Sequence, residues 1–230
     1  LETRFRLDRR PCKWQRFLVP CVMLVGISGS WAFGWLSIDP LGRDPCCQSW
    51  PFMHALHAAN KWIGQPAGAL AVMLIVWCTL ADPGWVRASD APEEVPASWD
   101  RCTVHHCGLI RPPGSHHCRE CDACVAGFDH HCSWLGVCIG KHNRGPFIAL
   151  LASGGVSWLL LGVASIQAAW IRFDWSHFGW WVLRSFVGAW FHWQAGTYLV
   201  GSFVLQLRLL RRGSTQWQWT KLQNKSFATG

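Results

Sequence analysis

The sequence predicts an all-α polytopic membrane protein with four transmembrane helices and a cytosolic cysteine-rich domain between the second and third helices. Half of the 230 residues are apolar and only 15% are charged, which is unusual for a water-soluble domain. Four stretches of about 20 residues or more contain no Asp, Glu, Lys or Arg. Seven of the twelve cysteines lie between the second and third of these stretches.

The four charge-free stretches are residues 17–36, 62–81, 147–171 and 185–207. At ~1.5 Å per residue, each can cross a hydrocarbon core of ~30 Å as a helix. Several of them carry Trp near an end, as expected at a membrane–water interface. One such stretch could be a buried helix of a soluble protein, but four together favour a membrane protein. Their lack of charge also disfavours a channel or ion transporter.

Lysines and arginines are distributed unevenly along the chain. Seventeen of the 21 lie in residues 1–16, 82–146 and 208–230. The positive-inside rule therefore predicts that these three segments are cytosolic and that the connections 37–61 and 172–184 are lumenal. The net charge of +8 suits anionic lipid headgroups. Because no nucleic-acid-binding motif accompanies this charge, we expect membrane lipid and not DNA or RNA as a partner.

The start of the chain predicts no secretory signal peptide. The first apolar stretch begins about 16 residues in, and no small-residue cleavage site follows a short apolar core. The first residue is Leu and not Met, so we expect the natural amino terminus to lie outside this sequence.

The central segment, residues 82–146, has the composition of a metal-binding module. Disulfides are rare in the reducing cytosol, so its cysteines need another explanation. The spacing Cys118-x2-Cys121-x2-Cys124, preceded by His117, is typical of compact zinc sites. The segment shows little apolar periodicity and cannot bury a core of its own. We therefore expect bound metal to supply folding free energy, ~10 kcal/mol or more per structural site.

Residues 107–147 read "CGLIRPPGSHHCRECDACVAGFDHHCSWLGVCIGKHNRGPF". This segment resembles the Asp-His-His-Cys (DHHC) cysteine-rich domain of protein S-acyltransferases. The matching positions are Arg111-Pro112, His117-Cys118, Cys121, Cys124, Asp129 to Cys132, Trp134, Cys138, Gly140, Asn143 and Phe147. Asp82–Gly84, directly after the second stretch, and Asn224–Phe227 are similar to two further motifs of the family. The order of two spans, cysteine-rich loop and two spans also matches.

The sequence departs from the family pattern at three single positions and in one short motif. Val104 stands where the family has the first Cys of an opening C-x2-C pair, Ser133 replaces a Pro, and Val137 replaces an Asn. Residues 215–218, Thr-Gln-Trp-Gln, replace a Thr-Thr-x-Glu motif. These departures bear on turnover rate and substrate range, and they leave a catalytically weak zinc-binding membrane scaffold as an alternative function.

The resemblance implies two structural zinc ions, each held by three Cys and one His. The second site would be Cys118, Cys121, His131 and Cys138. The first would be Cys107, His117 and Cys124 with a fourth ligand, for which we expect Cys102 in a C-x4-C pair; His105 and His106 are the alternatives. Four protein ligands leave no open position for substrate, so neither zinc would take part in the chemistry.

The resemblance also implies transfer of a palmitoyl or similar long acyl chain from acyl-CoA to cysteines of substrate proteins. Cys132 would be the nucleophile, with His130 as its base and Asp129 orienting the imidazole. Four residues would contact acyl-CoA: Arg111 at the phosphates with help from Lys141 and Arg144, and Trp134 at the acyl chain. The protein substrates cannot be read from the sequence. The endoplasmic reticulum and Golgi membranes fit best, and the plasma membrane remains open.

Overall fold

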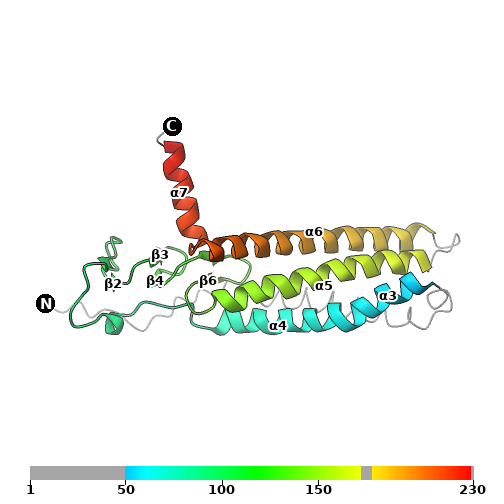
Figure 1. The fold of residues 1–230 in the computed structure, drawn as a ribbon, viewed down its shortest axis with the longest axis horizontal. Helices are drawn as coiled ribbons and strands as arrows, with labels where there is room; N and C mark the ends of the chain where they lie inside the picture. Colours follow the sequence, from blue (N-terminus) through cyan, green and yellow to red (C-terminus); the bar gives the residue numbers. More distant parts are fainter. Residues whose placement is uncertain (1–49, 172–177, 229–230) are drawn as a thin grey trace. The chain divides into compact units, whose positions relative to one another are not determined.

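The computed structural model describes residues 50–171 and 178–228 (Figure 1). Contacts divide the chain into two compact units. Among the described residues, one unit contains Ile75–Phe147 and residues 206–228, and the other contains residues 50–74 and Ile148–Leu205. The predicted span 17–36, and with it most of the segments on either side, lies outside the described residues.

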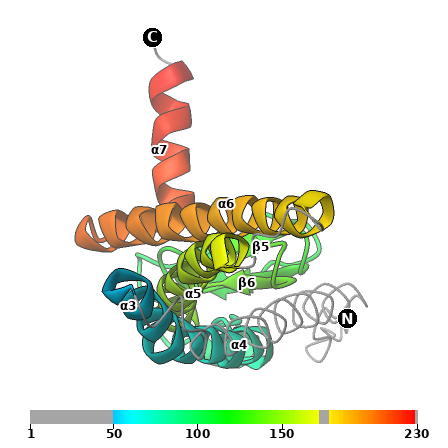
Figure 2. The same ribbon diagram turned by 90° about the vertical axis from the view of Figure 1, so that its right-hand side faces the viewer.

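The helices of the second unit are α3 (Pro51–Ala59), the π-helical turn η2 (Asn60–Gly64), α4 (Gln65–Leu80), α5 (Arg144–Ile171) and α6 (Phe178–Arg211). They make up the described part of this unit, and α4, α5 and α6 each end or begin in the first unit. Both ribbon views show α5 between α4 and α6 (Figures 1 and 2). Small residues permit this packing: a Cβ on Gly155 would lie 2.8 Å from Cγ2 of Val200, and one on Gly196 would lie 2.8 Å from the side chain of Leu159.

Two helices in the described part of the chain, Pro51–Leu80 and Arg144–Ala168, are long and apolar enough to cross a membrane. The first begins at Pro51, although the sequence predicted a start at Trp62. Lys61 interrupts the charge-free stretch without interrupting the helix, and its ammonium lies 5.5 Å from the centre of the Trp62 ring. The predicted span 185–207 is helical throughout, within α6.

The prediction of an all-α fold was wrong for the cysteine-rich segment, which folds as three antiparallel two-stranded hairpins. They are β1 (Asp100–Arg101) with β2 (Ile110–Arg111), β3 (His116–Cys118) with β4 (Ala123–Val125), and β5 (His130–Cys132) with β6 (Val137–Ile139). A 3-10 turn, η3 (Ala88–Asp90), precedes them. Strands of two or three residues are too short for the alternating pattern that marks a strand in a sequence.

Gly140 lies in a tight turn that packs against both the start and the middle of the cysteine-rich segment. A Cβ on Gly140 would lie 2.5 Å from the carbonyl oxygen of Pro83 and 2.6 Å from Cγ1 of Val125, so no larger residue fits. The Asn143 amide closes the turn, because its Oδ1 accepts from the Gly140 amide at 2.9 Å and its Nδ2 donates to the Cys138 carbonyl at 2.9 Å.

The last helix, α7 (Gln216–Ala228), begins within the segment that departs from the Thr-Thr-x-Glu motif. Thr215 and Gln218 form a reciprocal cap at its start. The Gln218 amide donates to Oγ1 of Thr215 at 3.3 Å, and the Thr215 amide donates to Oε1 of Gln218 at 2.9 Å. Gln substitutes well for Glu in such a capping box, so this departure keeps the helix start intact.

Candidate metal centres and active site

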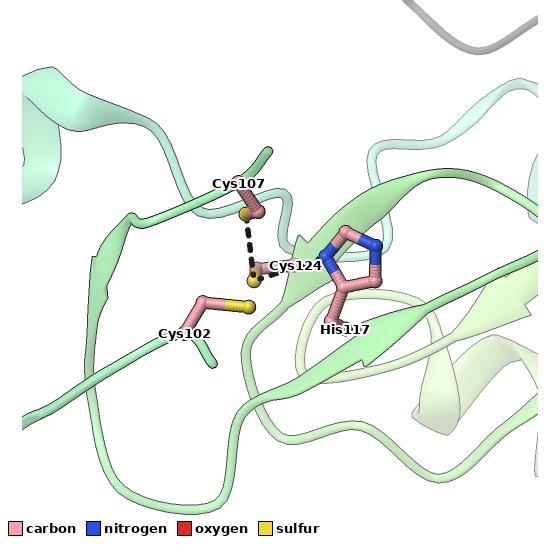
Figure 3. A group of neighbouring side chains, drawn as sticks. All are labelled: Cys102, Cys107, His117 and Cys124. Atoms are coloured by element: carbon pink, nitrogen blue, oxygen red, sulfur yellow. Dashed lines mark hydrogen bonds between the residues drawn. The ribbon is translucent and has the colours of Figure 1, made fainter. Parts of the chain in front are cut away.

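The first Cys/His cluster is Cys102, Cys107, His117 and Cys124, whose ligand atoms all lie within 4.8 Å of one another (Figure 3). Sγ of Cys124 lies 3.6 Å from Sγ of Cys107 and 3.7 Å from Nδ1 of His117. His117 and Cys124 face each other across the β3–β4 hairpin, so the register of this hairpin alone brings two of the four donors together. All four residues are buried.

The second cluster is Cys118, Cys121, His131 and Cys138, again with ligand atoms within 4.8 Å of one another. Nδ1 of His131 lies 3.6 Å from Sγ of Cys118, 3.5 Å from Sγ of Cys121 and 3.7 Å from Sγ of Cys138. His131 and Cys138 face each other across the β5–β6 hairpin. The two hairpins therefore present donors at equivalent positions.

The spacing of the donor atoms fits a tetrahedral metal ion. Donors at ~2.1–2.3 Å from a zinc ion lie ~3.4–3.8 Å from each other along the edges of the tetrahedron. The distances above, together with 3.4 Å between the sulfur atoms of Cys138 and Cys121, fall in this range. Three sulfurs and one imidazole nitrogen also form a donor set that zinc favours. Each cluster can therefore hold a metal ion.

Neither alternative ligand of the first cluster takes part in it. His105 is exposed. Nε2 of His106 lies 2.6 Å from Oδ1 of Asp122, and the same oxygen lies 3.3 Å from Nε2 of His117. Asp122 adopts a positive φ of 49°, a conformation that Asp tolerates better than most residues. Its carboxylate thus contacts the far nitrogen of His117 and leaves Nδ1 to the cluster.

Cys132 belongs to neither cluster, although it follows His131 directly. It is buried at the end of β5, beside the pair formed by Asp129 and His130. Nδ1 of His130 lies 2.9 Å from Oδ2 of Asp129. Burial by itself would lower the pKa of His130, but hydrogen bonding to Asp129 and Cys132 outweighs burial and raises the pKa to about 9. The imidazole is therefore protonated at neutral pH.

The Asp129 carboxylate is fully enclosed and accepts several hydrogen bonds. Oδ1 accepts from the backbone amide of Gln216 at 2.8 Å, and Oδ2 accepts from Nε2 of Gln206 at 2.7 Å. The guanidinium of Arg144 lies 3.5 Å from Oδ1. Burial opposes ionisation, yet the bonds from His130, Gln216 and Gln206 hold the pKa of Asp129 below its usual range.

The family model for DHHC palmitoyltransferases matches residues 99–223, which is more than half of the chain. The chain belongs to the DHHC palmitoyltransferase family. The match begins just before β1 and ends within α7, so the DHHC domain includes both clusters and the Asp129–His130 pair.

Several curated relatives match parts of the chain. Palmitoyltransferase ERF2 of Eremothecium gossypii is 49% identical over 61 residues, 26% of this chain and 16% of that protein. Probable protein S-acyltransferase 15 of Arabidopsis thaliana is 34% identical over 98 residues, 40% of this chain and 39% of that protein. Palmitoyltransferase AKR1 of Mortierella alpina is 38% identical over 92 residues, 36% of this chain and 16% of that protein. The matches thus span less than half of these relatives.

The four residues expected at acyl-CoA lie in different environments within the DHHC domain. Trp134 is 59% exposed and Lys141 is exposed, so both are free to meet a ligand. Arg111 faces Asp100 across β1–β2 and donates to both of its carboxylate oxygens, at 3.0 Å and 3.1 Å. Arg144 contacts Gln206 and Asp129, and its contact with a CoA phosphate stays a prediction.

Sequence reasoning missed Gln206 and Asp100 as parts of the DHHC site. The signal for Gln206 was an amide near the end of a largely apolar stretch, where a buried polar group needs a partner, but Gln194 in the same stretch gave the same signal. Asp100 gave no comparable signal, because an isolated acidic residue in a loop is usually solvated.

Proposed function

We propose that this DHHC protein is an integral-membrane S-acyltransferase. It transfers a long-chain fatty acyl group, such as palmitoyl, from acyl-CoA to cysteine thiols of substrate proteins through an S-acyl-Cys132 intermediate. The observation that carries the proposal is a cysteine that remains outside both four-donor clusters and lies beside the pair formed by half-buried His130 and buried Asp129. The names of the relatives, palmitoyltransferase and S-acyltransferase, support the same reaction class.

The first half-reaction forms the acyl-enzyme. The Cys132 thiolate attacks the thioester carbonyl carbon of acyl-CoA, so that a new carbon–sulfur bond forms and the bond to the CoA sulfur breaks. The protonated His130 first stabilises the thiolate and then donates a proton to the departing CoA sulfur. Asp129 keeps the imidazole oriented through its 2.9 Å contact with Nδ1.

The second half-reaction reverses these roles with a protein acceptor. The cysteine thiol of the substrate gives its proton to neutral His130 and attacks the S-acyl carbonyl. The acyl group leaves Cys132, whose thiolate is restored beside the imidazolium. One thioester replaces another in each step, so the exchange needs no further energy source.

Zinc is the metal that we propose for both clusters. Each ion would have four protein ligands and would act as a structural cross-link, supplying folding free energy to a segment of short hairpins. The ligands of the first site are Cys102, Cys107, His117 and Cys124, and those of the second are Cys118, Cys121, His131 and Cys138.

The membrane setting completes the proposal. Four spans, two of them the long apolar helices described above, would leave the termini and the cysteine-rich segment 82–146 in the cytosol, in a protein of the endoplasmic reticulum, Golgi or plasma membrane. Arg111 and Lys141 would meet the CoA phosphates, and the exposed Trp134 would contact the acyl chain near its thioester end. The acceptors would be cytosolic or membrane-associated proteins with accessible cysteines.

Labelling with palmitoyl-CoA tests the proposal. Purified protein incubated with labelled palmitoyl-CoA should acquire label that hydroxylamine removes, and Cys132→Ala should acquire none. Cys46→Ala is the matched control, because it removes a cysteine from the predicted lumenal loop, and it should label like the wild type. An unlabelled wild type that still binds two metal ions would favour the scaffold alternative, and equal labelling of Cys132→Ala would exclude Cys132 as the nucleophile.

A further inference from the structure

We infer that Gln206 and Arg144 are positioning residues for the Asp129–His130 pair, an inference that rests on the proposed acyltransferase function. Gln206 lies near the end of α6 and is only 2% exposed. Its Nε2 donates to Oδ2 of Asp129 at 2.7 Å, the oxygen that also contacts Nδ1 of His130. A side chain far away in the sequence therefore holds the carboxylate oxygen that orients the imidazole.

Arg144 fixes the orientation of the Gln206 amide. Nε and one terminal nitrogen of Arg144 donate to Oε1 of Gln206 at 3.2 Å and 3.1 Å. With its oxygen held in this way, the amide must turn its NH2 group toward Asp129. The terminal nitrogen of Arg144 that donates to Gln206 also donates to the Ser214 carbonyl oxygen at 3.0 Å. The guanidinium is therefore held by two acceptors, one on each residue.

The arrangement also balances charge around a fully enclosed carboxylate. Asp129 has no exposed side-chain surface, and Arg144 is only 15% exposed at 3.5 Å from it. A buried carboxylate without a nearby cation would be costly to ionise. Arg144 supplies such a cation beside Asp129. The imidazolium of His130 is therefore not the only positive charge that compensates the negative charge of the carboxylate.

Every member of this network lies in one compact unit of the chain. Arg144 begins α5, Gln206 lies near the end of α6, and Gln216 begins α7 and donates its backbone amide to Oδ1 of Asp129. If this network only linked helices to one another, its hydrogen bonds would not need to end on the Asp129 carboxylate. Because these donors converge on Asp129, we assign the network to preorganisation of the pair and not to packing alone.

The test compares rates of acyl-enzyme formation in Gln206→Met and Arg144→Met with the wild type. Gln206→Met should lower the maximal rate about 10- to 100-fold, as when supporting contacts of a catalytic group are lost, with little change in the KM for palmitoyl-CoA. Arg144→Met should lose less, because Gln206 remains. The double variant should lose less than the product of the two single losses, because part of the effect of Arg144 acts through Gln206, and Arg144→Lys should recover part of the rate by donating to Oε1.

Two controls make the same chemical changes at exposed positions of α6. Gln194→Met and Arg208→Met should keep the wild-type rate, and all variants should keep two metal ions per chain. An unlabelled wild type would overturn the acyltransferase proposal and this inference with it. A labelled wild type with an unchanged maximal rate in Gln206→Met would overturn only the inference. Loss of metal from both Gln206→Met and Arg144→Met would also overturn it, since the network would then be structural.

Discussion

Cys118 and Cys132 occupy the same position in two hairpins of the same register. Each is the third residue of a His-His-Cys strand, facing Ala123 in β3–β4 and Val137 in β5–β6. Cys118 lies 3.6 Å from Nδ1 of His131 within the second cluster, whereas Cys132 joins neither cluster. One tripeptide therefore provides a metal ligand in one hairpin and a candidate nucleophile in the other.

The two tripeptides differ in the residue that precedes them and in the surroundings of their first His. Ser115 precedes the first tripeptide, the ring of His116 contacts Phe128 and Trp217, and burial lowers the pKa of His116. Asp129 precedes the second and keeps His130 protonated. An imidazolium beside Cys132 stabilises a thiolate without the help of a metal.

The first prediction contrasts these two cysteines. Cys118→Ser should reduce bound metal from two ions per chain to about one, because a thiolate ligand is replaced by a poor one. Cys132→Ser should retain two ions and lose hydroxylamine-sensitive label. Metal analysis beside labelling distinguishes the two variants, and metal loss in Cys132→Ser would contradict the assignment of Cys132 to chemistry.

The second prediction concerns the fourth ligand of the first cluster. Cys102→Ser should release about one metal ion per chain, because Cys102 lies within the four-donor set. His105→Ala should release none, since His105 is exposed and outside the cluster. The metal content of the two purified variants tests this prediction. Loss of metal from His105→Ala but not from Cys102→Ser would mean that His105 is the fourth ligand.

The third prediction concerns the contact between Asp122 and His117. Asp122→Ala removes the carboxylate at 3.3 Å from Nε2 of His117. Loss of such a partner typically weakens metal affinity about 10- to 100-fold, so metal should leave the first cluster at lower chelator concentration. Glu120→Ala, an exposed acidic change two residues away, is the control and should behave like the wild type.

The limits of sequence reasoning follow from the range of the contacts involved. The grouping of the eight ligands could be predicted because short spacings such as Cys118-x2-Cys121 restrict the geometry, and a known family supplied the pairing. The bond between Gln206 and Asp129 joins residues 77 positions apart, and no local pattern marks it. The hairpins were missed because their pairing depends on the facing donors His117 with Cys124 and His131 with Cys138, not on apolar alternation.

The fourth prediction concerns Asp100 and the proposed phosphate contact of Arg111. Asp100→Asn removes a carboxylate that competes with phosphate for the guanidinium. Because an exposed ion pair is worth about 0.2–1 kcal/mol, the KM for palmitoyl-CoA should fall about 1.5- to 5-fold. Glu94→Gln, at another exposed position, should leave KM unchanged. A higher KM in Asp100→Asn would mean that the pair instead holds Arg111 in its binding position.

The fifth prediction concerns the protonation of His130. The hydrogen bond that His130 donates to Asp129 helps to raise the pKa of His130 to about 9, so the proton is held at neutral pH and lost as the pH rises through about 9. Asp129→Asn removes the negative charge while burial still favours the neutral imidazole, so the pKa of His130 should fall and the proton should leave at lower pH.

Diethyl pyrocarbonate modifies neutral imidazole only. Mass spectrometry of the peptide containing His130 should therefore show modification at lower pH in Asp129→Asn than in the wild type, with His105, which is exposed, as the internal reference. Identical pH profiles for the two proteins would mean that Asp129 does not control this proton.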